Sequence, residues 1–325
     1  MAWRGLDGRV SIMNDLLSNP QTVSLATRCI DRPALALGGD NKVYLAWTGF
    51  DRSVNVMSSD DGMVFSSRLT LPGKSVFGPA IAFRKAKLIV TWVDADSGTL
   101  MIMDDALETS EVLTTKETSS AAPALACQEF VDGTSASFVA WRGTNAQQQL
   151  NVMSADTSGK ITFPPDDTNA TTSVSGPSLI FKTAPDSTTF LVISWAGLPG
   201  GTDHDNHLNI ISSFSNAFTD FDQRRTVQPV SSKGPAVIDI TKAADADVLC
   251  AWVDNGKTKR TKTKSILRVE LFKTVLSGDF KAIAKLPLPD LENAQPSSSR
   301  PRRRRGWRAP RTRAGNALTP NSPNN

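Results

Sequence analysis

Tryptophan recurs along this chain in one kind of short sequence, an apolar stretch that ends in Trp and is followed within a few residues by Gly or Asp. Successive copies lie 44, 45, 49, 54 and 57 residues apart. A feature repeated at this spacing indicates a chain built from one supersecondary unit that is used several times. The tryptophans in this phase are Trp3, Trp47, Trp92, Trp141, Trp195 and Trp252.

The clearest unit lies between residues 43 and 65, and its apolar pattern has the period of β-strands. Alternation over Val43–Trp47 is interrupted by a turn sequence, Thr48–Asp51. It resumes over Val54–Met57 before a second turn at Ser58–Gly62. Alternation over four to eight residues, bounded by Gly, Asp and Ser, predicts two antiparallel strands joined by a short turn.

Two further strands complete each unit, and we name the four strands a, b, c and d in chain order. Strand a begins at a proline 13 to 18 residues before the Trp that ends strand b; the first unit lacks it. Four antiparallel strands in 44 to 57 residues make a unit the size of a β-propeller blade. The prolines are Pro33, Pro79, Pro123, Pro177 and Pro235. The c strands are expected at Val10–Met13, Val54–Met57, Leu100–Met103, Leu150–Met153, Leu208–Ile211 and Ile266–Leu271, and d strands at positions such as Arg68–Leu71 and Lys281–Leu286.

The two ends of the chain predict how the repeat closes. The first unit opens inside strand b, so its strand a should come from the C-terminal end, near Pro296. The sequence there continues as three serines and an arginine- and proline-rich stretch, which cannot fill an inner strand. We therefore expect an all-β, six-bladed β-propeller over residues 1–298, whose last blade is shared between the termini and imperfectly closed. Residues 299–325 are expected to form a disordered basic tail.

A turn motif in the second unit suggests a family. Ser58, Asp60, Gly62 and Phe65 match the Asp-box pattern, in which Ser and Asp oxygens bond turn amides, Gly takes a positive φ and the aromatic packs under the hairpin. A second copy with a one-residue insertion spans residues 154–163. Over about residues 1–296 the chain resembles the sialidase-like, Asp-box (BNR) propeller family, as a degenerate member. The Asp box is expected to be structural.

The resemblance implies a sialidase-type exo-glycosidase as one possible function. Such an enzyme needs three arginines for the substrate carboxylate, an acidic Asp and a Tyr–Glu nucleophile pair. Arg32, before Pro33, matches the arginine of the family signature, but its flanking residues do not match. The only tyrosine, Tyr44, lies within strand b, and no glutamate is a clear partner for it. We therefore expect no catalytic residues, and keep the hydrolase as the alternative.

Acidic or amide side chains follow the Trp in most b–c loops. An aromatic face with a neighbouring carboxylate is a common way to hold a sugar. The b–c loop face could therefore carry lectin-like glycan sites, and a protein-interaction scaffold is a further alternative. Equally, each Trp could be wedged between blades while the Asp caps the turn. The candidate residues are Trp3, Asp7, Trp47, Asp51, Asp94, Trp141, Asn145, Asp203 and Asp254.

Two polar b–c loops have a second interpretation. Residues 202–207 contain both histidines, beside aspartates, and could hold a divalent metal or form a solvated surface loop. Lys257–Lys264 could attract an acidic ligand or form a solvated hairpin tip. We expect no metal and no cofactor.

Composition separates the tail from the rest. Eight of the 36 basic residues are arginines in residues 300–325, which leaves 28 basic against 32 acidic residues elsewhere. A mildly acidic body argues against specific nucleic-acid binding, whereas the tail could bind polyanions nonspecifically.

Three scattered cysteines do not suggest a disulfide framework. No apolar run is long enough for a membrane span, and the repeat begins at the first residues, which leaves no room for a signal peptide. The location stays open, between a cytoplasmic and a non-classically exported protein. Glycans or glycoconjugates are the expected partners.

Overall fold

A computed structural model describes most of the chain up to residue 285, and the described residues fall in one compact unit, Met1–Pro289. The described ranges are 1–14, 21–108, 111–146, 148–155, 160–162, 172–183, 189–197, 207–213, 225–230, 234–239, 248–254, 266–274 and 280–285. Their regular structure is entirely β-strand. Within these ranges no helix is long and apolar enough to cross a membrane.

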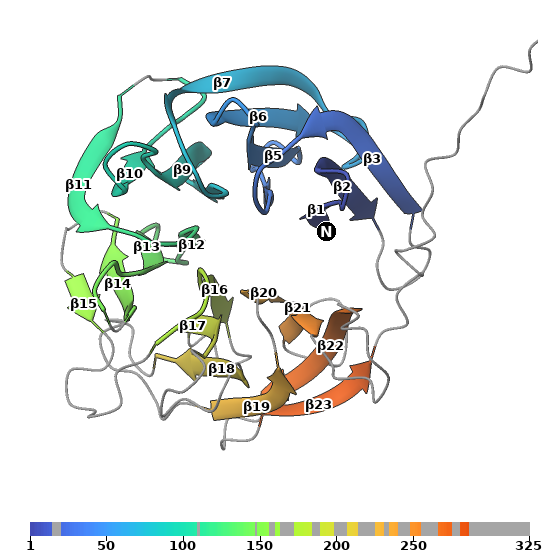
Figure 1. Cartoon of the computed structure of the whole chain (residues 1–325), viewed down its shortest axis with the longest axis vertical. Coiled ribbons are helices and arrows are strands. Elements are labelled where there is room, and N and C mark those ends of the chain that lie inside the picture. The colour runs from blue at the N-terminus through green and yellow to red at the C-terminus, as the bar shows by residue number, and fades with distance from the viewer. Residues whose placement is uncertain are drawn as a thin grey trace, which may run out of the picture. The chain divides into compact units, whose positions relative to one another are not determined.

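The described strands pair into six antiparallel sheets, whose strand order follows the chain (Figure 1). The first sheet has three strands, β1 (Ala2–Arg4), β2 (Arg9–Asn14) and β3 (Gln21–Arg28). The second sheet has β4 (Ala34–Leu37), β5 (Val43–Thr48), β6 (Ser53–Ser59) and β7 (Ser66–Lys74). The third has β8 (Ala80–Arg84), β9 (Lys87–Val93), β10 (Thr99–Met103) and β11 (Leu113–Thr118). The fourth has β12 (Ala124–Glu129), β13 (Ser135–Arg142), β14 (Leu150–Ser154) and β15 (Lys160–Thr162). The fifth has β16 (Ser178–Thr183), β17 (Thr189–Ala196), β18 (His207–Ser212) and β19 (Arg225–Val230). The sixth is β20 (Ala236–Asp239), β21 (Val248–Asp254), β22 (Ile266–Thr274) and β23 (Phe280–Lys285).

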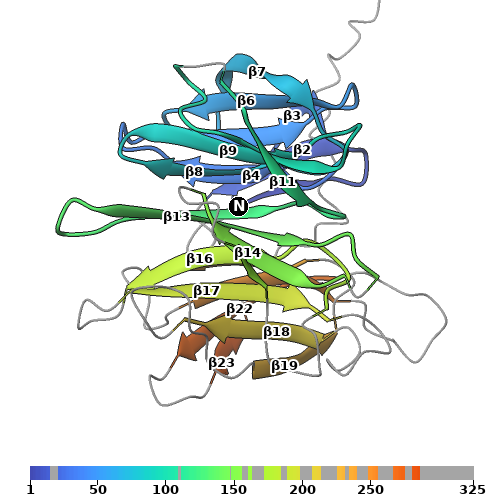
Figure 2. The same ribbon diagram turned by 90° about the vertical axis from the view of Figure 1, so that its left-hand side faces the viewer.

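The prediction of an all-β fold made of antiparallel units is confirmed. Each sheet corresponds to one repeat of the sequence, and every proline-led start is followed by the first strand of a four-stranded sheet. The first sheet has three strands, as expected for a unit that opens inside strand b. In Figure 2 the strands β16, β17, β18 and β19 of the fifth sheet run side by side as one layer.

The recurrent tryptophans fill the spaces between neighbouring sheets. Trp47 of β5 clusters with Val10 and Ile12 of β2, in the preceding sheet. Trp141 packs in the same way on residues of β9 and β10, and Trp195 on residues of β13 and β14. Because each indole is among the largest fully buried side chains, these contacts supply much of the apolar burial between sheets. The periodic Trp therefore marks the interface between one unit and the next.

The first strands of neighbouring sheets contact one another in chain order: β4 with β8, β8 with β12, β12 with β16, and β16 with β20. In Figure 1, β12, β16 and β20 lie toward the middle of this unit. Arg32, just before β4, extends toward the starts of β12 and β16. Its Nη2 donates to the carbonyl oxygens of Ala122, Pro123 and Pro177 at 3.2, 3.0 and 3.1 Å. One side chain thus joins three sheets.

Candidate functional site

The b–c turns that follow the tryptophans share one hydrogen-bonding pattern. Asp7 Oδ1 accepts the backbone N–H of Arg9 at 3.0 Å, and Asp51 Oδ1 accepts that of Ser53 at 3.1 Å. In the fourth sheet Asn145 Oδ1 accepts the N–H of Gln149 at 3.1 Å. Each of these side chains therefore caps its own turn.

A glycine two residues before Asp7 and before Asp51 explains the spacing from Trp to Asp in the first two sheets. A Cβ built on Gly49 would lie 2.5 Å from Asp51 Oδ1, and one on Gly5 would lie 2.9 Å from Asp7 Oδ1. The carboxylate folds back against the main chain, and only a residue without Cβ leaves room for it. The repeated Trp-x-Gly-x-Asp sequence thus has a local structural reason. It is not by itself a sign of repeated sugar sites.

The structure also buries the tryptophans that we considered as sugar-stacking faces. Trp47 is 1% exposed and Trp141 is fully buried, so neither indole presents a face to solvent. For these residues the wedge interpretation is correct and the stacking interpretation is wrong, because the indole is needed between the sheets. Trp3 is only partly buried. Asp94 caps its turn, accepting from the backbone N–H of Asp96 and Ser97 at 3.2 and 2.9 Å.

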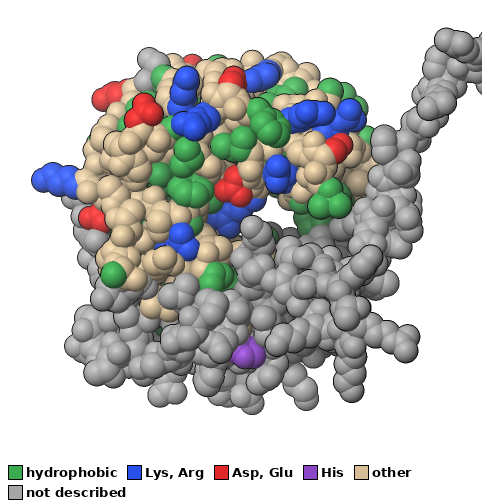
Figure 3. Space-filling view, viewed as in Figure 1, with side chains coloured by type: hydrophobic (Ala, Val, Ile, Leu, Met, Phe, Trp, Pro, Cys, Tyr) green, Lys and Arg blue, Asp and Glu red, His purple; other side chains and the backbone are tan. Residues whose placement is uncertain are grey.

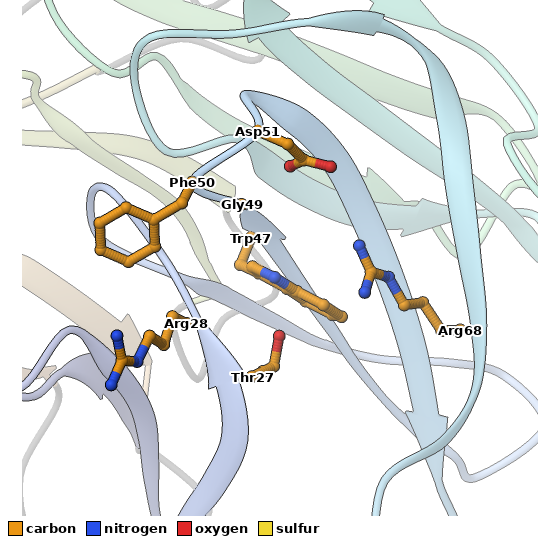
Figure 4. Close-up of a pocket in the computed structure, with 7 residues that line it drawn as sticks. All are labelled: Thr27, Arg28, Trp47, Gly49, Phe50, Asp51 and Arg68. Atoms are coloured by element: carbon orange, nitrogen blue, oxygen red, sulfur yellow. The ribbon is translucent and has the colours of Figure 1, made fainter.

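One hollow does open on the b–c side, between the first and second sheets. Its volume is about 470 Å³, and Figure 4 shows its lining side chains. Trp47 and Thr27 lie in the middle of the group; Phe50 and Arg28 lie on one side, and Asp51 and Arg68 on the other. The complete lining is Thr27, Arg28, Trp47, Gly49, Phe50, Asp51 and Arg68. These residues come from β3, β5, the turn after β5, and β7.

The next interface shows how such a space is closed. In the first sheet the N–H of Cys29 donates to Gly8 O, and in the second sheet the N–H of Ser75 donates to Arg52 O in the same way. Cys29 and Ser75 are therefore equivalent. Thr27 and Gly73, each two residues earlier, are equivalent as well. Gly73 has φ +117°, and a Cβ built on it would lie 3.2 Å from Trp92 Cζ2. The main chain at Gly73 therefore rests directly on the indole of the next sheet. Thr27 instead lines an open hollow beside Trp47.

Phe50 is the exposed aromatic of this site, and we did not select it from the sequence. It is 59% exposed, at the tip of the turn between Gly49 and Asp51. A Cβ on Gly8 would lie 3.2 Å from Phe50 Cζ, so the ring lies across the neighbouring b–c turn. One feature of the sequence could have indicated that Phe50 is exposed: it lies beyond the apolar alternation of strand b, and that alternation ends at the buried Trp47.

Arg68 is held in place by buried groups. Its Nε donates to Asn55 Oδ1 at 2.9 Å, and its guanidinium lies 5.6 Å from the ring centroid of Trp47. Asn55 is itself fully buried and donates through Nδ2 to Ser53 O at 2.7 Å. These contacts fix the guanidinium at the edge of the hollow.

Asp51, on the same side of the hollow, stays ionised at neutral pH. The hydrogen bond from the backbone N–H of Ser53 lowers the pKa of Asp51 below its ordinary value, with a smaller contribution from the charge of Arg68. The hollow therefore contains a carboxylate and a guanidinium on one side, and a second guanidinium, that of Arg28, on the other.

The turn that we predicted as an Asp box is placed one residue later than expected. Asp61, not Asp60, accepts the backbone N–H groups of Met63 and Val64, both at 2.8 Å, and Ser59 Oγ donates to Asp61 at 2.9 Å. Because β6 continues to Ser59, the turn begins one residue later than we placed it. Gly62 has the expected positive φ, +71°. Phe65 is partly buried and packs beside the Trp47 cluster.

Two other candidates gain no support as chemical groups. Burial, together with the hydrogen bond that Tyr44 donates to Asp40 at 2.9 Å, raises the pKa of Tyr44 to about 12, which disfavours a nucleophilic phenolate. Arg32 is hydrogen-bonded to three carbonyls. In the part of the chain that the structure describes, no group of His, Cys, Asp and Glu could hold a metal ion.

Several predicted features lie outside the described residues. Of the 154–163 motif, Ser154 is described but Asp156, Gly159 and Phe163 are not. The side chain of Asp254 also lies outside them. The others are Asp203, His204, the Lys257–Lys264 loop, the expected closing strand near Pro296 and residues 299–325.

Comparison with known proteins identifies a fold but no family: no protein-family model and no curated sequence matches the chain. The BP39L lectin from Burkholderia pseudomallei has a similar structure, with a TM-score of 0.58 at 13% identity over 88% of this chain and 80% of the lectin. The SapL1 lectin, solved in complex with alpha methyl fucoside, gives a TM-score of 0.57 at 12% identity over 89% and 92%. The α-L-arabinofuranosidase Arb93a from Fusarium graminearum gives 0.53 at 14% identity over 80% and 84%.

At these identities the likeness shows a propeller-like all-β fold and does not assign an activity. Membership of the sialidase-like family stays a prediction.

Proposed function

We propose that this chain is a non-catalytic carbohydrate-recognition protein, built as a six-bladed β-propeller over residues 1–298 with an Arg-rich tail after it. The proposed binding site is the hollow between β3 and the turn after β5. Lectins and a glycosidase among the structures of similar fold make a sugar a reasonable ligand class. Fold alone does not determine function, so the proposal depends on the chemistry of the hollow.

The observation that carries the proposal is the combination of groups in the hollow. Phe50 offers an exposed aromatic ring, which can lie against the C–H face of a sugar. Asp51 and Arg68 offer an acceptor and donors on one side, which suit neighbouring hydroxyl groups. A few convergent polar groups around an apolar surface are typical of small-ligand sites.

One open hollow of this size supports only weak binding, on the order of 0.1–1 mM for a monosaccharide. Useful affinity would then come from dense glycan surfaces that engage several molecules or several sites. The turn of the first sheet, with Trp3 and Asp7, is a further candidate because Trp3 remains partly exposed.

Glycoside hydrolysis is the alternative, and the hollow gives it little support. Most such enzymes use a pair of carboxyl groups flanking the scissile bond. Among the residues that line the hollow, Asp51 alone carries a carboxylate.

Replacing Phe50 with alanine should lower the overall affinity for a dense glycan surface about tenfold, equivalent to ~1.4 kcal/mol, because the stacking surface is lost. The measurement is surface plasmon resonance on the glycans that the wild-type chain selects from a glycan array. Val131→Ala is the control, since Val131 is a fully exposed apolar residue in the turn between β12 and β13, away from the b–c turns. Equal binding by the Phe50 variant would exclude this hollow, and turnover of an arrayed glycan would favour the hydrolase.

A further inference from the structure

The charges around the hollow are unevenly balanced. Its lining contains two guanidinium groups, Arg28 and Arg68, and one carboxylate, Asp51. Asp51 lies on the same side as Arg68 in Figure 4, and the two charges interact, since Arg68 contributes to the lowered pKa of Asp51. Arg28, beside Phe50 on the other side, therefore remains as the positive charge that the lining does not compensate.

Arg28 is also available to a ligand. It is the last residue of β3 and its side chain is exposed. Within the described part of the chain, its side chain has neither a hydrogen bond nor an ion pair. Arg68, by contrast, already uses its Nε on Asn55 and its face on Trp47. The two arginines thus differ in role: Arg68 is fixed by the protein, and Arg28 has its donors unengaged by described groups.

Charges elsewhere on this side do not form one continuous field. Figure 3 shows Lys and Arg side chains interspersed with Asp, Glu and apolar side chains over the described part of one face. Arg9 lies opposite Arg28 in the register of β2 and β3, and its charge is paired with Asp7 at 3.5 Å. Because exposed charges more than about 8–10 Å apart are largely screened at physiological salt, a small ligand in the hollow responds chiefly to the lining charges and to this neighbouring pair.

On the basis of the proposed function, we infer that the hollow prefers a sugar carrying one anionic group, a carboxylate or a sulfate, and that Arg28 recognises this group. The sugar ring lies against Phe50, with its anionic substituent toward Arg28. Its hydroxyl groups then reach Asp51 and Arg68, which serve neutral and anionic sugars alike. Guanidinium donors match the planar, two-oxygen edge of a carboxylate or sulfate.

The test uses the full chain on immobilised pairs of sugars that differ only in charge: glucose and glucuronate, galactose and galacturonate, N-acetylglucosamine and its 6-sulfate. We expect the anionic member of at least one pair to bind about five- to tenfold more tightly. Raising NaCl to about 0.5 M should reduce that preference. The uronate and sulfate arms separate the two anionic groups.

The variants separate the inference from the proposed function. Arg28→Gln should abolish the preference for the anionic sugar and affect the neutral sugar much less than the anionic one, whereas Arg68→Gln should weaken both members of a pair. Lys74→Gln is the matched control, because Lys74 occupies the position of Arg28 at the interface that Gly73 closes. If the wild-type chain binds the neutral and the anionic sugar of every pair equally, and Phe50→Ala loses binding of both, the inference about Arg28 is overturned while the proposed function stands.

Two further outcomes count against the inference. A preference that Arg28→Gln and Lys74→Gln reduce equally would place its origin in general surface or tail charge. Failure of the wild-type chain to bind any sugar would overturn the proposed function, and the inference with it.

Discussion

Replacing Arg32 with methionine should lower the free energy of unfolding by about 3 kcal/mol or more. The guanidinium donates to three backbone carbonyls, at Ala122, Pro123 and Pro177, which belong to the starts of two other sheets. Methionine keeps the apolar stem and removes the donors. The three carbonyl oxygens would lose a charged hydrogen-bond donor. Protein atoms, more than water, surround the guanidinium of Arg32, and this burial lowers the pKa of Arg32.

The measurement is urea denaturation followed by tryptophan fluorescence, which reports on indoles buried between the sheets. Arg52→Met is the control, because that arginine is exposed in a b–c turn and should change stability by less than about 0.5 kcal/mol. Equal effects of the two substitutions would show that Arg32 does not stabilise the packing of the inner strands.

Replacing Gly78 with alanine should cost about 2–3 kcal/mol, for a steric reason. A Cβ at this position would collide with the carbonyl oxygen and carbon of Arg32, which are backbone atoms and cannot rotate away. The N–H of Gly78 also donates to Asp31 Oδ2 at 2.8 Å, which ties this turn to the preceding sheet. The added methyl group must therefore separate two turns that are directly bonded.

Gly39→Ala provides the comparison for Gly78→Ala. No atom lies within 4 Å of a Cβ on Gly39, so alanine there meets open space. Thermal unfolding of the two variants should differ by several degrees, with Gly39→Ala close to the unsubstituted chain. If Gly78→Ala is as stable as Gly39→Ala, the close approach of the two turns is not required by the fold.

The repeat and its strands could be predicted because they depend on local pattern. Alternation around Trp47 and the proline before each first strand correctly marked the sheets. The direction in which an aromatic faces could not be read in the same way. Trp47 and Phe50 lie three residues apart, yet one fills the space between sheets and the other lies at the tip of a turn. Only the contact with the preceding sheet decides which is buried.

The candidate site was harder to predict because it joins two units that are consecutive in the chain but meet only through packing. Arg28 ends the last strand of one unit, and Asp51 lies in a turn of the next. The sequence identified Asp51 from its fixed distance to Trp47, but the main reason for that distance is the Gly49 turn. Arg28 and Phe50 had no repeated pattern that could indicate them.

The difference between Thr27 and Gly73, at equivalent positions of two sheets, has a consequence for how the sequence of such a repeat protein can evolve. At one outer-strand position the main chain rests on the neighbouring indole where the residue is Gly73, whereas a hollow lies beside the indole where the residue is Thr27. Neither residue is an apolar member of the buried clusters, although Gly73 borders one of them through Trp92. Recognition sites at successive interfaces could therefore be gained or lost one at a time, while the inter-sheet tryptophans and the stability they provide stay the same.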